Sequence, residues 1–201
     1  INSEKVIRWN DKTGKIINGD MNGFDSVIHL AGAGIGDKRW SQKRKDIIRD
    51  SRVIPTANLS KILAGLDQPP KAFLSGSAIG YYGDRGIESI DESSSKGDGL
   101  LSETCSQWEQ ASSVAEEAGI RVSHLRSGIV ISPLGGALAK LLLPTKMGGG
   151  GPVGGGRQIQ SWISLDDEIY AIHHLMMQDT SQGAYNLTSP NSVSQKIFAK
   201  K

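Results

Sequence analysis

The residues best suited to chemistry lie together in the stretch 73–83. Ser75, Ser77, Tyr81 and Tyr82 place four hydroxyl groups within eight positions, with glycines between them. Hydroxyl groups donate hydrogen bonds that can orient a carbonyl group, and glycine lets a flat ligand approach the backbone closely. The same residues would also suit a β-hairpin rich in serine and tyrosine. We therefore carry two interpretations of this stretch, a ligand-facing strand end and a hairpin.

The position of these hydroxyl groups depends on the strand before them. Residues 71–74 form an apolar run after two prolines, and the chain then changes abruptly to small residues. This pattern is typical of a buried strand whose C-terminal end opens into a crevice. A second candidate strand, 24–32, is nearly continuously apolar from Val27 to Ala31 and ends in glycine, as buried parallel strands do. His29 inside that run is predicted to be a core histidine rather than a ligand.

Three glycines follow the second run at positions 32, 34 and 36. Their spacing is G-x-G-x-G, whereas a dinucleotide fingerprint has G-x-G-x-x-G and an acidic residue about twenty positions later. A helical region comes next, with Ser41 as its N-cap and Pro55 expected to kink or split it. Basic residues between 38 and 52 are interleaved with aspartates, which favours a solvated helix face over a phosphate site.

Helices and strands then continue to alternate. Residues 84–99 are acidic and rich in turn formers, which predicts a surface loop. A helix is predicted over 101–118, with Gly119 ending it, and strands are predicted over 122–126 and 129–131. Three alternations of this kind predict an α/β fold with a doubly wound parallel sheet of the Rossmann-like type. Ligands of such sheets bind in the crevice at the C-terminal ends of the strands.

Beyond Pro133 the predicted elements are shorter. They are a helix over 135–143, a glycine-rich loop over 148–156, a strand over 158–165, a helix ending at Met177 and a strand over 185–187. Asp166, Asp167 and Glu168 stand at the start of the helix that ends at Met177, where acidic groups interact favourably with the helix dipole. The glycine-rich loop is predicted to be a substrate loop, with a mobile lid as the alternative.

Composition limits the classes of function. The chain has 201 residues and a net charge of +2, so no charge excess indicates nucleic acid or an anionic membrane as the partner. A small-molecule substrate is the better fit. No apolar run reaches membrane length, and one cysteine, Cys105, cannot form an intramolecular disulfide. We expect a cytoplasmic protein without a metal site.

Several motifs, in their order along the chain, resemble the extended short-chain dehydrogenase/reductase superfamily. The closest resemblance is to an atypical subgroup called epimerase family proteins, whose bacterial members are also labelled cell-division-inhibitor-like. The motifs are DSVIHLAG at 25–32, RWS at 39–41, SRV at 51–53, SGSAIGYYG at 75–83, CSQWE at 105–109, LRSGIV at 125–130, GGGPVG at 149–154 and WISLDD at 162–167. This resemblance covers almost the whole chain. It implies NADP as the cofactor, with NAD not excluded.

The resemblance also implies a division of the chain. Residues 1–132 correspond to a nucleotide-binding Rossmann-like domain, and 133–201 to a small substrate-side portion interwoven with it. Members of the family begin with a strand, a glycine-rich turn and a helix that hold the cofactor pyrophosphate, and this sequence starts after them. We therefore predict that about fifty to sixty residues precede Ile1 and that a further segment follows Lys201.

The family's catalytic Tyr-x-x-x-Lys is replaced in this sequence. Cys105 stands at the tyrosine position and Glu109 at the lysine position, and a glutamate there is expected to raise the pKa of the thiol. In the enzyme hypothesis, Ser77 hydrogen-bonds a substrate carbonyl and Glu109 orients the ribose hydroxyls of the cofactor. Tyr81 or Cys105 then supplies the proton. The residues expected to line the cofactor are Leu30, Ala31, Gly32, Ser75, Gly76, Arg126, Ser127 and Gly128.

The rival hypothesis belongs to a different class of function. It is an NADP(H)-sensing regulatory protein that has lost the catalytic pair and acts through a protein partner, with cell division as the process named by the family label. A homodimer is the other partner considered. The enzyme hypothesis predicts an NAD(P)-dependent oxidoreductase or epimerase, and both hypotheses require the cofactor.

Overall fold

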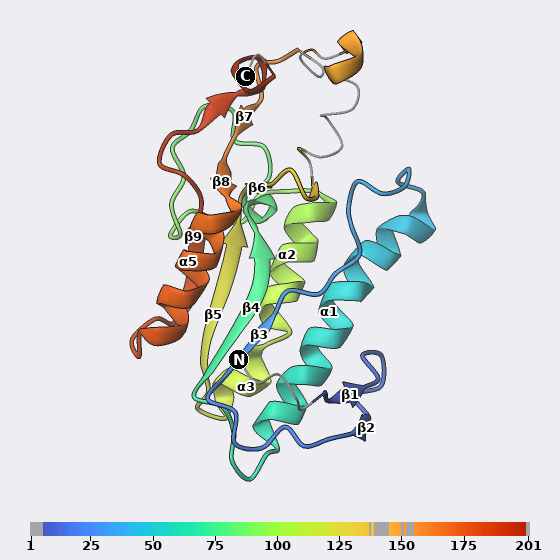
Figure 1. The fold of residues 1–201 in the computed structure, drawn as a ribbon, viewed down its shortest axis with the longest axis vertical. Helices are drawn as coiled ribbons and strands as arrows, with labels where there is room; N and C mark the ends of the chain where they lie inside the picture. Colours follow the sequence, from blue (N-terminus) through green and yellow to red (C-terminus); the bar gives the residue numbers. More distant parts are fainter. Residues whose placement is uncertain (1–5, 137, 139–144, 150, 152–154, 200–201) are drawn as a thin grey trace.

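A computed structural model describes residues 6–136, 138, 145–149, 151 and 155–199 of the chain (Figure 1). At its centre is a four-stranded sheet in the order β3-β4-β5-β9, in which each pair of neighbours is parallel. These strands are β3 (Ser26–His29), β4 (Ala72–Ala78), β5 (Arg121–Ser127) and β9 (Gly183–Leu187). The predicted parallel α/β sheet is confirmed.

Helices cover both faces of this sheet (Figure 1). The helices on one face are α1 (Gln42–Ala64), α2 (Leu100–Gln110) and α3 (Ser113–Glu117), and the helix on the other is α5 (Leu165–Met177). Phe73 of β4 is buried in a core with α1 and α3, whereas the next residue, Leu74, is buried in a core with α5. Successive side chains of a strand point to opposite faces, so β4 contributes to both cores. This two-sided covering is the predicted doubly wound arrangement.

Helix α1 begins as predicted but is not split. The Ser41 Oγ accepts a hydrogen bond from the Arg44 backbone N–H at 3.3 Å, which caps the helix. Pro55 lies inside the helix and is buried, and the predicted split does not occur. Ile48 before the proline and Leu59 after it are both buried. Packing on both sides of Pro55 outweighs the loss of one backbone hydrogen bond.

The helix predicted over 101–118 is broken at Ser112, between α2 and α3. The Ser112 hydroxyl donates to the Glu109 carbonyl at 2.7 Å, and the Ser60 hydroxyl donates to the Ser112 carbonyl at 3.1 Å. Buried serine hydroxyls therefore satisfy backbone groups at the break. The apolar spacing on both sides of Ser112 does not reveal this interruption, because both helices face the same core.

Strand β3 is the edge strand of the described sheet, which changes the burial predicted for 24–32. Val27 packs against the core with α1, but Ile28 is 44 % exposed and Leu30 is 56 % exposed. A strand at the edge of a sheet has one neighbour instead of two. His29 is buried, as predicted for a core histidine, although its Nε2 has no hydrogen-bond partner among the described residues.

Smaller elements surround the central sheet. Three two-stranded sheets join β1 to β2, β6 to β8 and β7 to β10 in the described part of the chain. The remaining bounds are β1 (Arg8–Trp9), β2 (Ile16–Asn18), β6 (Ile129–Ile131), β7 (Ile159–Gln160), β8 (Trp162–Ser164), β10 (Val193–Ser194), the 3₁₀ helix η1 (Ile79–Tyr82), the π-helical turn η2 (Thr145–Gly149) and α6 (Gln195–Phe198).

After Pro133, the observed helices and strands agree only in part with those predicted from the sequence. The strand predicted over 158–165 is divided into β7 and β8 at Ser161. The strand predicted over 185–187 is β9, which completes the central sheet. Most of the helix predicted over 135–143 and much of the glycine-rich loop lie outside the described residues. None of the helices in the described part of the chain is long and apolar enough to cross a membrane.

Candidate functional site

The hydroxyl-rich stretch is a strand end, and the hairpin interpretation is wrong. Strand β4 lies between β3 and β5 and runs parallel to both. It is followed at once by η1, a single 3₁₀ turn that carries Tyr81 and Tyr82. Ser77 is opposite Arg126 in the register of β4 and β5, so the C-terminal ends of these two strands bring their side chains together.

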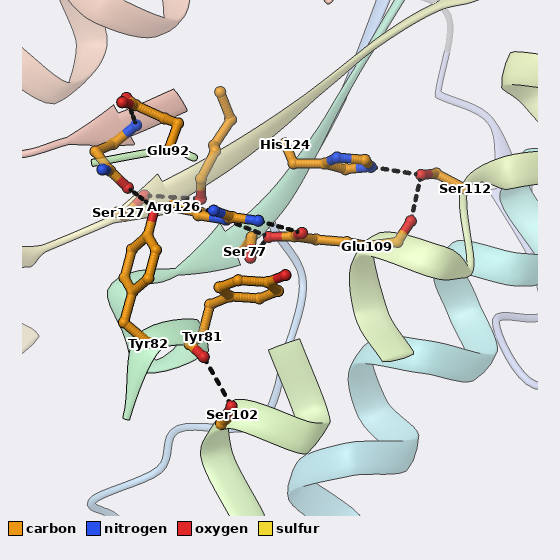
Figure 2. A network of polar contacts seen from close by, with 12 residues as sticks. Ser77, Tyr81, Tyr82, Glu92, Ser102, Glu109, Ser112, His124, Arg126 and Ser127 are labelled. Carbon is orange, nitrogen blue, oxygen red and sulfur yellow. Dashed lines mark hydrogen bonds and ion pairs between the residues drawn. The ribbon is translucent and has the colours of Figure 1, made fainter. Parts of the chain in front are cut away.

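A buried ion pair joins α2 to β5 (Figure 2). The Arg126 Nε donates to the Glu109 Oε1 at 2.8 Å, and the Arg126 Nη2 donates to the Glu109 Oε2 at 2.9 Å. The Arg126 and Glu109 side chains are only 5 % and 11 % exposed. Burial lowers the pKa of Arg126, but hydrogen bonds from its guanidinium to Glu109 and Tyr82 outweigh this effect and raise the pKa above its ordinary value. Arg126 is therefore a fixed cation.

Ser77 provides a further hydrogen bond to the carboxylate of this ion pair. Its hydroxyl donates to the Glu109 Oε1 at 2.6 Å. An ionised carboxylate only accepts hydrogen bonds, so the single proton of the Ser77 hydroxyl points to Glu109. Ser77 is itself buried. Two of the predicted catalytic residues, Ser77 and Glu109, are thus brought into direct contact, and Arg126, predicted to line the cofactor, holds the second of them.

The two tyrosines meet Arg126 in different ways. The Tyr81 ring lies against the guanidinium, whose carbon is 3.6 Å from the ring centroid. Tyr82 instead accepts a hydrogen bond from the Arg126 Nη1 at 2.8 Å and donates one to the Asn186 Oδ1 at 2.7 Å. The hydroxyl of Tyr81 makes no hydrogen bond with the described residues, whereas Tyr82 is a buried structural link.

The network continues into the acidic loop between η1 and α2. The Glu92 Oε1 accepts a hydrogen bond from the Asn186 backbone N–H at 2.7 Å, which fastens this loop to β9 (Figure 2). At the other end of the loop, the Ser102 hydroxyl donates to the carbonyls of Tyr81 and Gly97, each at 2.7 Å. Sequence reasoning identified only a surface loop here, and no motif or spacing indicates that Glu92 and Asn186 belong to the site.

Cys105 lies near Glu109 on α2 but is buried. Burial and the Glu109 carboxylate raise the pKa of the thiol to about 11. The expected direction of this change in pKa is confirmed, and burial is the larger cause. The thiolate is disfavoured, so Cys105 keeps its proton and is poorly suited to release it near neutral pH.

The glycines predicted to contact the cofactor are packed against atoms of the chain itself. A Cβ atom at Gly76 would lie 2.7 Å from the Cζ2 of Trp108, and one at Gly128 would lie 2.8 Å from the carbonyl oxygen of Ser161. At Gly32 a Cβ would lie 2.9 Å from the guanidinium carbon of Arg52. At Gly76 and Gly128 the neighbouring ring and backbone leave no room for a side chain, whether or not a ligand also approaches, whereas the neighbour of Gly32 is the far end of a flexible arginine side chain that can move.

The other predicted cofactor residues lie at the same edge of the sheet. Leu30 and Ala31 follow β3 and are exposed. Ser75 is completely buried inside β4, and its hydroxyl has no hydrogen-bond partner among the described residues. Ser127 ends β5 and donates a short hydrogen bond to the Glu168 Oε1.

The sequence suggests that Glu168 interacts with the dipole at the start of helix α5, whereas in the structure its side chain is buried. The helix α5 is capped by the Ser164 hydroxyl, which accepts from the Asp167 backbone N–H at 3.0 Å, and Glu168 is buried. Burial raises the pKa of the Glu168 carboxyl. Its spacing from Ile172 and Leu175 places it on the buried stripe of the helix, and this period of four and seven residues is the signal that sequence reasoning missed.

Two buried histidines make the stability of the fold depend on pH. Burial lowers the pKa of both His29 and His124. The unfolded chain then binds more protons than the folded chain as the pH falls below about 6.5, so stability is lost in that range. Each tenfold difference in proton affinity between the two states corresponds to about 1.4 kcal/mol. The raised pKa of Glu168 acts in the opposite direction, because the folded chain holds that proton up to a higher pH.

We therefore expect the free energy of unfolding to fall between about pH 6.5 and pH 5. Denaturant unfolding at several pH values measures it. The substitution His29→Gln should flatten this slope, whereas the same substitution at His173, an exposed residue of α5, should not. Equal slopes for the wild-type protein and the His29 variant would contradict the assignment to His29.

Comparisons of the sequence and of the structure with known proteins identify similar proteins. No protein-family model matches the chain. An epimerase family protein of Mycobacterium bovis is 38 % identical over 197 residues, which are 98 % of this chain and 64 % of that protein. The epimerase family protein YfhF of Bacillus subtilis is 34 % identical over 178 residues, which are 88 % of this chain and 58 % of that protein. The chain thus spans about three fifths of the length of these relatives.

Two solved structures are also similar to the model. The human epimerase family protein SDR39U1, crystallised with NADPH, has a TM-score of 0.83 and 31 % identity, covering 88 % of this chain and 60 % of that chain. A nucleoside-diphosphate sugar epimerase from Corynebacterium glutamicum has a TM-score of 0.76 and 37 % identity, covering 88 % and 37 %. The parallel sheet, the sequence motifs and these relatives lead to the same family. The chain belongs to the epimerase family proteins, an atypical group of short-chain dehydrogenases/reductases.

Proposed function

We propose that this protein binds NADP(H) and transfers a hydride between the cofactor and a small-molecule substrate, as an oxidoreductase or epimerase. The observation that carries the proposal is the polar cluster of Ser77, Tyr81, Glu109 and Arg126 at the C-terminal edge of the parallel sheet. Ligands of doubly wound sheets bind at this edge. The human relative crystallised with NADPH supports the choice of cofactor.

The residues at this edge fit the nicotinamide half of such a cofactor. Exposed backbone follows β3 at Leu30 and Ala31, and the Ser75 hydroxyl is a buried group without a partner among the described residues. The carboxylate of Glu109 accepts two hydrogen bonds on Oε1 and one on Oε2. Because a carboxylate has about four acceptor positions, Oε2 can still accept one from a ribose hydroxyl. When bound, the cofactor supplies or takes the hydride.

Tyr81 is the group proposed to move the proton. Ser77 directs its proton to Glu109, and the Cys105 thiol is buried with a pKa of about 11. The Tyr81 hydroxyl makes no hydrogen bond with the described residues and is free to meet a substrate oxygen. The stacked Arg126 guanidinium fixes the plane of its ring. Orientation of this kind is the contribution that a protein makes to hydride transfer.

Fluorescence titration of the purified protein with NADPH, and in parallel with NADH, tests the first part of this proposal. We expect saturable binding with a preference for NADPH. Consumption of NADPH with a panel of carbonyl compounds then tests for chemistry. Absence of binding by either nucleotide would overturn the proposal, and NADPH binding that depends on a protein partner without any turnover would support a regulatory sensor instead.

A further inference from the structure

The outer face of helix α5 is an exposed surface that the candidate site does not use. This helix of 13 residues covers the face of the sheet opposite to α1, α2 and α3, and its inner side buries Glu168, Ile172 and Leu175 (Figure 1). On its outer side, Tyr170 is 73 % exposed and Met177 is 66 % exposed. These two side chains are two helical turns apart, so they form one apolar strip along the helix.

The polar residues of this face are arranged symmetrically about Tyr170. Asp166 and Asp167 lie four and three positions before it, and His174 and His173 lie four and three positions after it. Residues three and four positions apart lie on the same side of an α-helix. All four residues therefore flank Tyr170 on the outer face, and all four are exposed. Acidic groups stand at one end of the strip and histidines at the other.

A twofold axis through Tyr170 relates the two ends of this pattern. When a second copy of α5 packs antiparallel across such an axis, a residue four positions before Tyr170 meets the one four positions after it. Asp166 then faces the partner's His174, and Asp167 faces the partner's His173. An imidazole N–H donates a hydrogen bond to a carboxylate in either protonation state. Parallel packing would set aspartate against aspartate, so the charges select the antiparallel arrangement.

We propose that the outer face of α5 binds a second copy of this chain. The two helices form a symmetric antiparallel pair, with the Tyr170 rings at the centre and an Asp–His pair set on either side. This inference goes beyond the proposed function, because none of these residues belongs to the candidate site and no cofactor is needed for the contact.

The groups that pair across the axis are available for it. Asp166, His173 and His174 form no side-chain hydrogen bond or ion pair in the described part of the chain. Asp167 accepts one hydrogen bond from the Ser164 hydroxyl at 2.8 Å. A carboxylate has about four acceptor positions, so Asp167 can accept another from a histidine.

The expected association is weak. A single pair of helices buries less surface than the standard protein interface of about 1,600 Å², so we expect a dissociation constant of about 10–100 µM. The unfolding measurements of the His29 and His173 variants, made at about 1 µM protein, remain below this range and report on the monomer.

Sedimentation equilibrium of the protein between about 1 and 500 µM measures the association, and we expect a monomer–dimer equilibrium. Tyr170→Asp should weaken the dimer at least about tenfold, because it places two like charges at the centre of the interface. Ile87→Asp introduces the same acid at a loop residue that is 94 % exposed, and it should leave the association unchanged. A protein that stays monomeric throughout this range, or a dimer that Tyr170→Asp leaves intact, would overturn the proposal.

Two charge variants test the register of the pair. Asp166→Lys and His174→Glu should each weaken the dimer about three- to tenfold, because each sets like charges together at both ends of the interface. An equal mixture of the two variants should form a heterodimer as tight as the wild-type dimer. In it, the new lysine of one chain faces the new glutamate of the other, and the second Asp–His pair is kept. A mixture that associates no more tightly than the separate variants would reject this register, and with it the proposal.

Discussion

Arg126→Met is expected to lower the free energy of unfolding by about 3–5 kcal/mol, the usual cost of removing one partner of a buried ion pair. Glu109 would keep its charge in a buried position and lose the two hydrogen bonds that hold it. The Tyr82 hydroxyl would lose its donor as well. Urea denaturation at pH 7 measures the change.

Two controls show whether this cost arises from the ion pair. The double variant Glu109→Gln, Arg126→Met should recover part of the loss, because the stranded charge is gone. Arg49→Met removes an arginine that pairs with Asp50 on the surface, where both side chains are more than two fifths exposed, and should change stability little. A loss at Arg126 no greater than the loss at Arg49 would contradict the structural role given to this pair.

Tyr81→Phe is expected to lower turnover by about 10²–10⁴-fold, the usual contribution of a positioned proton donor or acceptor. Its stability should hardly change, because the hydroxyl makes no hydrogen bond with the described residues and the ring still stacks on Arg126. The assay is NADPH consumption with whichever carbonyl compound of the panel the wild-type protein reduces. Thermal unfolding of the same samples gives the stability.

The neighbouring tyrosine provides a matched control with the opposite pattern. Tyr82→Phe removes a hydroxyl that joins Arg126 to Asn186, so it should cost about 1–3 kcal/mol of stability. Its effect on turnover should be smaller than that of Tyr81→Phe. If the two variants lost the same turnover, or if Tyr82→Phe lost more, the proton would have to be assigned to another group.

The sequence predicts the elements of the site better than their contacts. Apolar runs that end in small residues located the C-terminal ends of β3 and β4. The family resemblance placed Cys105 and Glu109 at the positions of the catalytic pair, and the expected rise in the pKa of the thiol followed from that. The pairing of Glu109 with Arg126 was not predicted, because it depends on where α2 crosses the sheet. Periodicity describes one helix at a time and contains no information about crossing.

Burial was hardest to predict where the neighbours of an element decide it. The run around Ile28 and Leu30 is as apolar as a central strand, yet both residues are exposed because β3 has one neighbouring strand in the described sheet. Ser112 interrupts a helix that propensity would continue, because buried hydroxyls stabilise the break. In each case tertiary contacts override a correct local signal.

The hydrogen bond between Tyr82 and Asn186 also indicates how the candidate site forms when the chain folds. These residues are 104 positions apart, and Glu92 and Asn186 are 94 apart. Contacts between such distant positions form slowly, because the entropy cost of closing a long loop comes before the contact can stabilise the fold. Strand β9 pairs with β5, and this pairing places Asn186 beside Tyr82. The Tyr82 hydroxyl and the Glu92 carboxylate therefore reach Asn186 only in a chain whose strand β9 has joined the sheet.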